Sequence, residues 1–200
     1  MPIEDFKNLK GLWAKSLHRN GSNSPTKSGQ VWGNVLMRCK IGGAAQTRNP
    51  TYIGCTMSEN FKNFQFFAEW CQAQIGYGKP KYDIDKDILV QGNKEYHEDK
   101  CVFVPHPLNS FLVANDSRRG KYPQGIHLAS CGQLKVNVCV NGTMQHIGIY
   151  KTEQAAYAAY KQAKESEARR WYARLKAGEF IVDPRVIERM RVWSFTEGVE

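Results

Sequence analysis

The 200-residue sequence predicts an α+β fold made of two small domains. One sign is the strand pattern of residues 124–150, where every second residue from 134 to 140 is apolar and Asn141-Gly142 provides a tight hairpin turn. Another is the Ala-rich helical pattern that follows, from about residue 153 to 176. A third is an earlier strand, turn, strand and helix pattern between residues 81 and 115. We therefore expect a hairpin-plus-helix core followed by a three-stranded antiparallel sheet with a helix.

The composition indicates a globular chain with a polyanionic partner. Hydrophobic residues make up 42% and charged residues 24%, values that exclude wholesale disorder. The chain has 28 basic and 19 acidic side chains, a net charge of +9. Residues 115–176 hold 11 basic side chains against 4 acidic ones. This excess favours nucleic acid over an anionic membrane as the partner of that segment, with a solvated basic face as the alternative.

The sequence also predicts a cytoplasmic protein. No run approaches the roughly 18 apolar residues of a membrane span, and the first residues contain early acids and no apolar run typical of a signal peptide. The six cysteines include no C-x₂₋₄-C pair, since the nearest two are eight residues apart, and this spacing disfavours zinc. We expect reduced, mostly buried thiols rather than disulfides.

Four segments are predicted along the chain. Residues 1–30 form an N-terminal arm, with a short amphipathic helix over 1–18 and a polar linker after it. Residues 31–116 form the first domain, whose aromatic residues between Phe61 and Trp70 have the helical spacing of a core. Residues 117–176 form the second domain. The tail, 177–200, contains a short helix that Asp183 and Pro184 begin.

The second domain presents a polar sheet face. Leu134, Val136, Val138 and Val140 are expected on one face, and Lys135, Asn137 and Cys139 on the other. The small alanines of the following helix allow it to pack closely on the apolar face, which leaves the polar face free. Lys or Arg reads guanine edges in the major groove of DNA and Asn reads adenine. The predicted DNA-binding residues are Arg118, Arg119, Lys121, His127, Lys135 and Asn137.

Residues 118–164 resemble the APETALA-type DNA-binding domain of plant ethylene-response factors. The resemblance is carried by Gly125-Ile126, where the family usually has Gly-Val, by the step Ile147–Thr152, and by the helix segment Glu153–Tyr160. It implies a three-stranded sheet that lies in the major groove of double-stranded DNA.

The earlier hairpin pattern carries a different chemistry. Asp83, Asp85 and Asp87 alternate, so on a strand all three would point to one side. Like charges in such a cluster favour a bound cation, and carboxylates suit one hard divalent ion such as Mg²⁺ or Mn²⁺. A solvated strand face is the alternative.

This pattern, IDKDIL-x₂-GN-x₂-Y-x₄-CVFVP-x₂-LN, resembles the ββα-metal (HNH) core of phage homing endonucleases, which often join such a nuclease to a C-terminal APETALA-type domain. The resemblance implies metal ligands at Asp85 and Asn109. Lys86 stands where the family has the histidine that activates water, so His97, His106 or Lys86 itself would supply the base.

Together the two resemblances predict a metal-dependent DNA endonuclease that hydrolyses phosphodiester bonds in the host cell of a phage or mobile element. One such site cuts one strand, so a monomer would nick. A catalytically inactive, sequence-specific DNA-binding protein, such as a repressor or interference factor, is the alternative that Lys86 supports. An RNA-binding or scaffold protein is a third.

Overall fold

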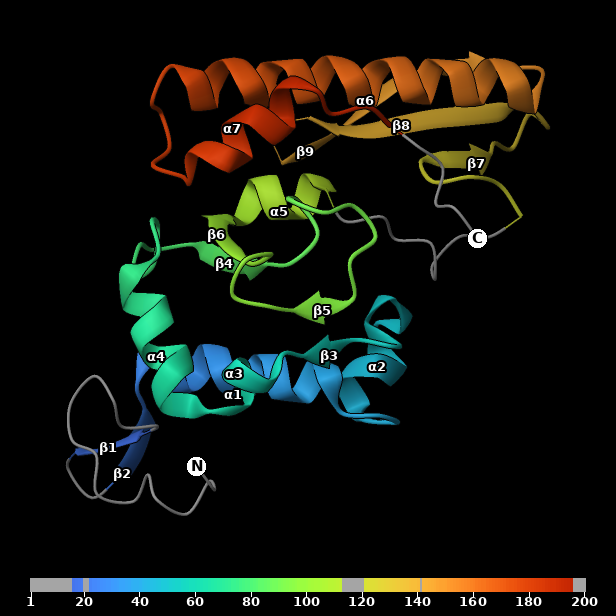
Figure 1. Cartoon of the computed structure of the whole chain (residues 1–200). Coiled ribbons are helices and arrows are strands. Elements are labelled where there is room, and N and C mark those ends of the chain that lie inside the picture. Colours follow the sequence, from blue (N-terminus) through green and yellow to red (C-terminus); the bar gives the residue numbers. More distant parts are fainter. Residues whose placement is uncertain (1–15, 20–21, 113–120, 141, 196–200) are drawn as a thin grey trace. The chain divides into compact units, whose positions relative to one another are not determined.

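The computed structural model describes residues 16–19, 22–112, 121–140 and 142–195 (Figure 1). Their helices and small sheets make a mixed α+β fold, as predicted. The chain divides into two compact units, unit 1 (Met1–Val104) and unit 2 (Pro105–Glu200). The predicted boundary between residues 116 and 117 lies outside the described residues. The helix after Pro105, which we expected in the first domain, belongs to unit 2.

The start of the described chain differs from the prediction. Strand β1 (Ser16–Arg19) pairs antiparallel with β2 (Ser22–Pro25), so the helix predicted up to residue 18 and the linker predicted up to residue 30 are wrong in the described part. Asn20-Gly21 is itself a two-residue hairpin signal. Helix α1 then begins at Lys27, because the Thr26 hydroxyl accepts a hydrogen bond from the Gly29 N–H at 3.1 Å and caps it.

Unit 1 packs short helices and strands around aromatic side chains. Its elements after the hairpin are α1 (Lys27–Cys39), α2 (Ala44–Arg48), a 3₁₀ turn (Pro50–Tyr52), β3 (Thr56–Met57), α3 (Glu59–Lys62), α4 (Phe64–Ala73), β4 (Tyr82–Asp85), β5 (Glu95–Tyr96) and β6 (Val102–Pro105). β3 pairs with β5 in parallel, and β4 pairs with β6. Phe61, Phe64 and Phe67 are completely buried, which confirms the predicted aromatic core.

Unit 2 contains the predicted three-stranded sheet and helix. Its elements are α5 (His106–Leu112), β7 (Ile126–Leu128), β8 (Leu134–Val140), β9 (Thr143–Tyr150), α6 (Glu153–Lys176) and α7 (Pro184–Arg191). The strands are antiparallel in the order β7-β8-β9, and α6 packs on all three (Figure 1). Thr152 caps α6, and Asp183 caps α7 as predicted.

The core of unit 2 lies between the sheet and α6. Leu134, Val136, Val138 and Val140 are buried, and they pack with Ala156 and Tyr160 of the helix. This confirms both the predicted alternation of β8 and the role of a small side chain in the helix–sheet contact.

A buried lysine joins α5 to α6. The Lys164 ammonium donates a hydrogen bond to the Phe111 carbonyl at 2.6 Å, in the last turn of α5, and lies 4.0 Å from the centre of the Phe111 ring. Burial lowers the pKa of Lys164 to about 8, although electrostatic attraction by Cys139 and Glu167 raises it in part. Lys164 is therefore partly neutral in the folded chain at mildly alkaline pH.

Replacement of Lys164 by methionine is expected to change how stability depends on pH. Above pH 8 the folded chain holds Lys164 neutral, whereas the unfolded chain keeps it charged up to about 10.5, so the unfolded state binds more protons and stability rises with pH. Between pH 7 and 10 this contributes about 2 kcal/mol. Urea unfolding of both proteins at the two pH values should show this rise only in the wild type. Parallel pH dependence in the two proteins would contradict the assignment.

Candidate functional site

The sheet of unit 2 has one face against α6 and one that faces outward. On β8 the outward side chains are Lys135, Asn137 and Cys139, which lie between the buried valines. The strand register adds His127 of β7 beside Lys135. On β9 the register places Ile149 opposite Lys135, His146 opposite Asn137, and Met144 opposite Cys139. We call these seven residues the outer face.

The outer face forms three rows across the strands. The first row is His127, Lys135 and Ile149, and its members are all exposed. The second row is Asn137 and His146, and the third is Cys139 and Met144. Side chains that lie opposite each other on neighbouring strands are about 5 Å apart at their Cβ atoms. The side chains of one row can therefore contact the same part of a bound partner.

Three of these seven residues were predicted as DNA-binding residues from the sequence, and the other four were not. His127, Lys135 and Asn137 lie on the outer face as expected, and Cys139 was expected to face outward but was not assigned a role. Met144, His146 and Ile149 were missed. The hairpin signal at Asn141-Gly142 could have found Met144, because it pairs residue 139 with residue 144.

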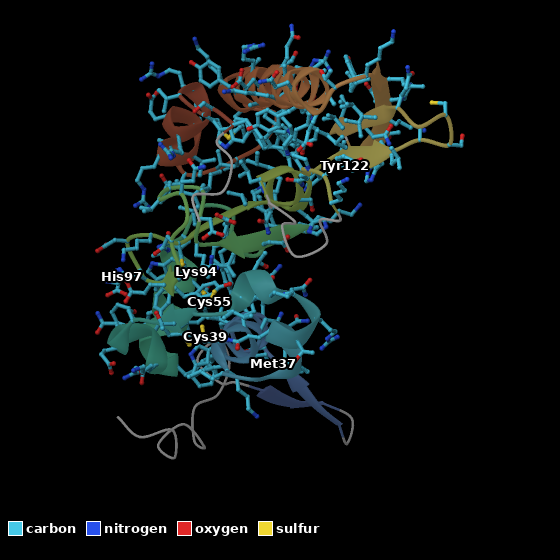
Figure 2. The ribbon with its side chains drawn as sticks, turned by 90° about the vertical axis from the view of Figure 1, so that its right-hand side faces the viewer. Met37, Cys39, Cys55, Lys94, His97 and Tyr122 are labelled. Carbon is cyan, nitrogen blue, oxygen red and sulfur yellow. The ribbon has the colours of Figure 1, made fainter. Side chains whose placement is uncertain are left out.

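The expected entrance to the sheet is only partly described. Arg118 and Arg119 lie outside the described residues. Lys121 is exposed, with its ammonium 5.7 Å from the centre of the Tyr122 ring. Tyr122 packs against the core of unit 2, and Figure 2 labels its position beside the strands.

Asp85 of unit 1 holds a turn. It is the last residue of β4 and is buried, and its Oδ1 accepts hydrogen bonds from the N–H groups of Asp87 at 2.9 Å and Ile88 at 2.6 Å. Burial, followed by repulsion from Asp87, raises the pKa of Asp85. The strand ends here, so the expected row of three carboxylates on one strand face is wrong: Asp83 is half-buried, Asp85 is buried and Asp87 is exposed.

Lys86 and Asn93 close the loop that follows Asp85. The Lys86 ammonium donates to the Asp87 carboxylate and, at 2.8 Å, to the Asn93 carbonyl. The Asn93 amide donates back to the carbonyls of Lys86 at 2.8 Å and Glu95 at 2.7 Å. Lys86 is buried, so in this position it serves as a structural cross-link of the loop. These hydrogen bonds give Asp85, Lys86 and Asn93, three residues of the predicted nuclease motif, a structural role in this loop.

His97 lies in the turn before β6, at the position that Figure 2 labels. Its Nδ1 accepts a hydrogen bond from the Asp99 N–H at 3.2 Å and is 3.6 Å from the Glu98 carboxylate. Burial opposes ionisation of the Glu98 carboxylate, but the hydrogen bonds that it accepts have the larger effect, and its pKa is lowered. Two of these hydrogen bonds come from the Ser58 hydroxyl at 2.8 Å and from the Asn60 amide at 2.5 Å. His97 therefore belongs to a polar cluster that ties β5 and α3 together.

His106 and Asn109 lie on α5, in unit 2. His106 is its exposed first residue, with Nε2 3.4 Å from the Ser110 hydroxyl. Asn109 is half-buried in the middle of the helix. Because Asp85 belongs to unit 1 and Asn109 to unit 2, their shared metal ion stays a prediction.

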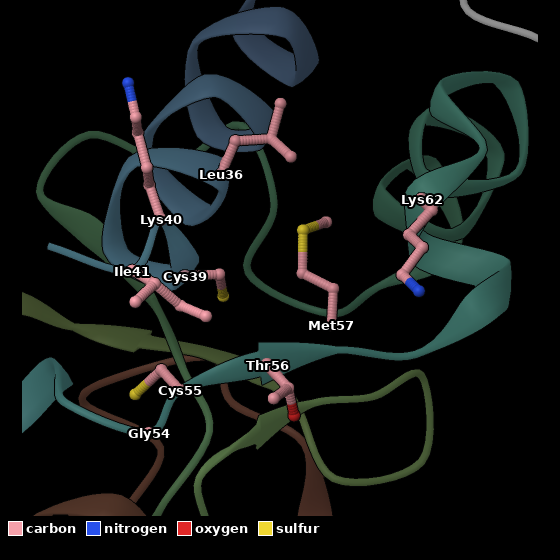
Figure 3. Close-up of a pocket in the computed structure, with 9 residues that line it drawn as sticks. All are labelled: Leu36, Cys39, Lys40, Ile41, Gly54, Cys55, Thr56, Met57 and Lys62. Carbon is pink, nitrogen blue, oxygen red and sulfur yellow. The ribbon is translucent and has the colours of Figure 1, made fainter. Parts of the chain in front are cut away.

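Unit 1 also contains a pocket of about 650 Å³ (Figure 3). It is lined by Leu36, Cys39, Lys40, Ile41, Gly54, Cys55, Thr56, Met57 and Lys62. Two of the lining residues, Cys39 and Cys55, are thiols, and Figures 2 and 3 label both of them. Burial raises the pKa of Cys39 to about 11 and also raises that of Cys55, so both are neutral thiols at physiological pH. The lining cysteines are therefore not activated nucleophiles.

Three observations concern the described residues as a whole. Among them, no three His, Cys, Asp or Glu side chains gather at one point as metal ligands would. In the same residues no helix is long and apolar enough to cross a membrane. All six cysteines are free thiols, three of them buried.

Comparison of the chain with protein-family models, curated proteins and solved structures finds no match.

Proposed function

We propose that the chain binds double-stranded DNA through the outer face of the β7-β8-β9 sheet. The observation that carries this proposal is the arrangement of Lys135, Asn137, His127 and His146 on one exposed face, with a packed core behind it. The buried valines of β8 and the helix behind them hold these side chains at fixed spacing. A preorganised set of donors and acceptors is what readout of base edges needs.

Charge supports the same partner. Residues 117–152, which contain the whole sheet, include five Lys or Arg residues and no Asp or Glu. Such a segment attracts a phosphate backbone without a competing internal carboxylate, and neutralised phosphates release counterions. Lys135 provides a positive charge on β8, and Lys121 and Lys151 lie just before and just after the strands, so no part of the sheet repels a phosphate backbone.

Dimensions fit the major groove. A two-stranded β-ribbon can enter it, and β8 with β9 makes such a ribbon of seven and eight residues. From Lys135 to Cys139 the face spans four residue steps, about 13 Å, which corresponds to about four base pairs. Lys135 suits guanine O6 and N7, and Asn137 suits adenine N6 and N7.

The first test is the double variant Lys135→Ala/Asn137→Ala. We expect it to bind a duplex selected from a random-sequence library by the wild type at least tenfold more weakly, because each base contact is worth about 1–3 kcal/mol. Fluorescence anisotropy over a range of salt concentrations measures this loss, and the slope against salt reports phosphate contacts.

Lys161→Ala is the matched control. Lys161 is exposed on α6, the helix that packs on the opposite face of the sheet, and it carries the same charge as Lys135. We expect this variant to bind as the wild type does. Equal loss in both variants would assign binding to overall charge, and preference for an RNA duplex of the same sequence would contradict the major-groove geometry, because the RNA groove is too deep and narrow.

A second candidate function, phosphodiester hydrolysis, is supported by one feature of unit 1, a carboxylate at the end of a paired strand. Strand β4 pairs with β6, and Asp85 stands at the end of β4, where a ββα-metal site needs its acidic ligand. Because Oδ1 is used by the turn, Asp85 would hold a divalent ion through Oδ2. Such an ion supplies Lewis-acid stabilisation of the phosphate.

Relaxation of supercoiled plasmid in Mg²⁺ or Mn²⁺ tests this candidate. We expect the wild type to nick and Asp85→Asn to lose nicking by more than a hundredfold while it keeps the turn, since an amide oxygen can still accept both hydrogen bonds. Lys62→Ala, an exposed residue of α3, is the control with nicking unchanged. Tight duplex binding with no nicking in either metal would leave DNA binding as the only function.

A further inference from the structure

An irregularity in β9 places an apolar side chain on the outer face. Val136 pairs with Gly148 and Asn137 pairs with His146, so Ile147 is one extra residue on β9. Without this bulge the alternation that puts Met144 and His146 outward would put Gly148 outward and Ile149 inward. Because of the bulge the alternation is reversed after Ile147, so Ile149 faces outward and lies opposite Lys135. Bulges that re-aim a side chain in this way often lie next to functional sites.

The outer side of β9 is therefore mostly apolar. Met144 is 62% exposed and Ile149 is 50% exposed, with His146 between them. The uncovered face of an antiparallel sheet is ordinarily polar. The two apolar residues flank the polar pair Asn137–His146, and each lies in a row with a residue of β8.

We infer that Met144 and Ile149 contact thymine methyl groups, so that the sheet recognises a site in which thymine stands beside the bases read by Lys135 and Asn137. This inference rests on the proposed DNA binding. The C5 methyl of thymine is the apolar group that B-DNA shows in its major groove. Lys135 and Ile149 lie in one row, so the guanine and the thymine that they contact are in adjacent base pairs.

The experiment removes only the methyl groups. A duplex selected by the wild type from a random-sequence library is synthesised with thymine and again with deoxyuridine at every thymine position. We expect the wild type to bind the thymine duplex about tenfold more tightly, because burial of one methyl group is worth about fourfold and two are contacted. The variant Met144→Ala/Ile149→Ala should bind the two duplexes equally.

Ile181→Ala is the matched control, because Ile181 is also exposed, at 56%, but lies between α6 and α7 rather than on the sheet. It should keep the tenfold preference. Equal affinity of the wild type for both duplexes, a selected site without thymine, or a preference that persists in the double variant would overturn this inference and leave DNA binding intact. Absence of any duplex binding would overturn both proposals.

Discussion

Replacement of Gly125 by alanine is expected to lower the free energy of unfolding of unit 2 by about 3 kcal/mol. Gly125 has φ +77°, a conformation that disfavours any side chain. A Cβ at this position would lie 2.1 Å and 2.4 Å from two ring carbons of Tyr160 and 2.7 Å from the Asn137 carbonyl oxygen. Tyr160 is buried in the core, so its ring has no space to move into.

The same substitution should also weaken DNA binding. The Gly125 carbonyl accepts a hydrogen bond from the Asn137 N–H at 2.9 Å, so a shift of residue 125 moves the strand segment that carries Asn137. At temperatures where the variant remains folded, we expect its affinity for the selected duplex to fall along with its stability.

Gly132→Ala separates backbone strain from the clash. Gly132 has φ +78°, nearly the same as Gly125, but no atom lies within 4 Å of the position of its Cβ. We expect a loss of about 1 kcal/mol, the cost of the left-handed conformation alone. Urea unfolding followed by circular dichroism measures both variants. Equal losses in the two would mean that the contact with Tyr160 contributes nothing.

Unit 2 was predictable because its signals are local. β8 shows a period-two pattern over seven residues, Asn141-Gly142 links it directly to β9, and the helix extends over 153–176 as expected. What the pattern could not show is the bulge at Ile147. The residues from 143 to 150 fit a regular strand, and only their pairing with β8 reveals that Ile149 faces outward.

Unit 1 was less predictable because its structure depends on distant contacts. β3 and β5 have two residues each and pair in parallel across almost forty residues of chain, so neither has a recognisable pattern of its own. The alternating Asp83, Asp85 and Asp87 fit a strand equally well. The strand ends at Asp85 because its carboxylate accepts backbone hydrogen bonds from the residues that follow, as aspartate often does in turns.

Asp85→Ala is therefore expected to destabilise unit 1 by about 3 kcal/mol. The change leaves two backbone donors, the N–H groups of Asp87 and Ile88, without their acceptor beside a buried side chain. Each unsatisfied buried donor costs about 1–3 kcal/mol. Urea unfolding monitored by tryptophan fluorescence measures the loss, because Trp32 and Trp70 belong to the core of unit 1 or pack against it.

Asp85→Asn is the matched variant, and pH gives it a distinct signature. Because burial raises the pKa of Asp85 above its unfolded value, the folded wild type holds a proton more tightly than the unfolded chain, and its stability falls as pH rises through the folded pKa. The asparagine variant keeps an oxygen acceptor and has no proton to lose, so its stability relative to the wild type should be greater at pH 7 than at pH 4. If the asparagine variant instead loses as much stability as the alanine variant at both pH values, the turn depends on the carboxylate charge rather than on an acceptor at Oδ1.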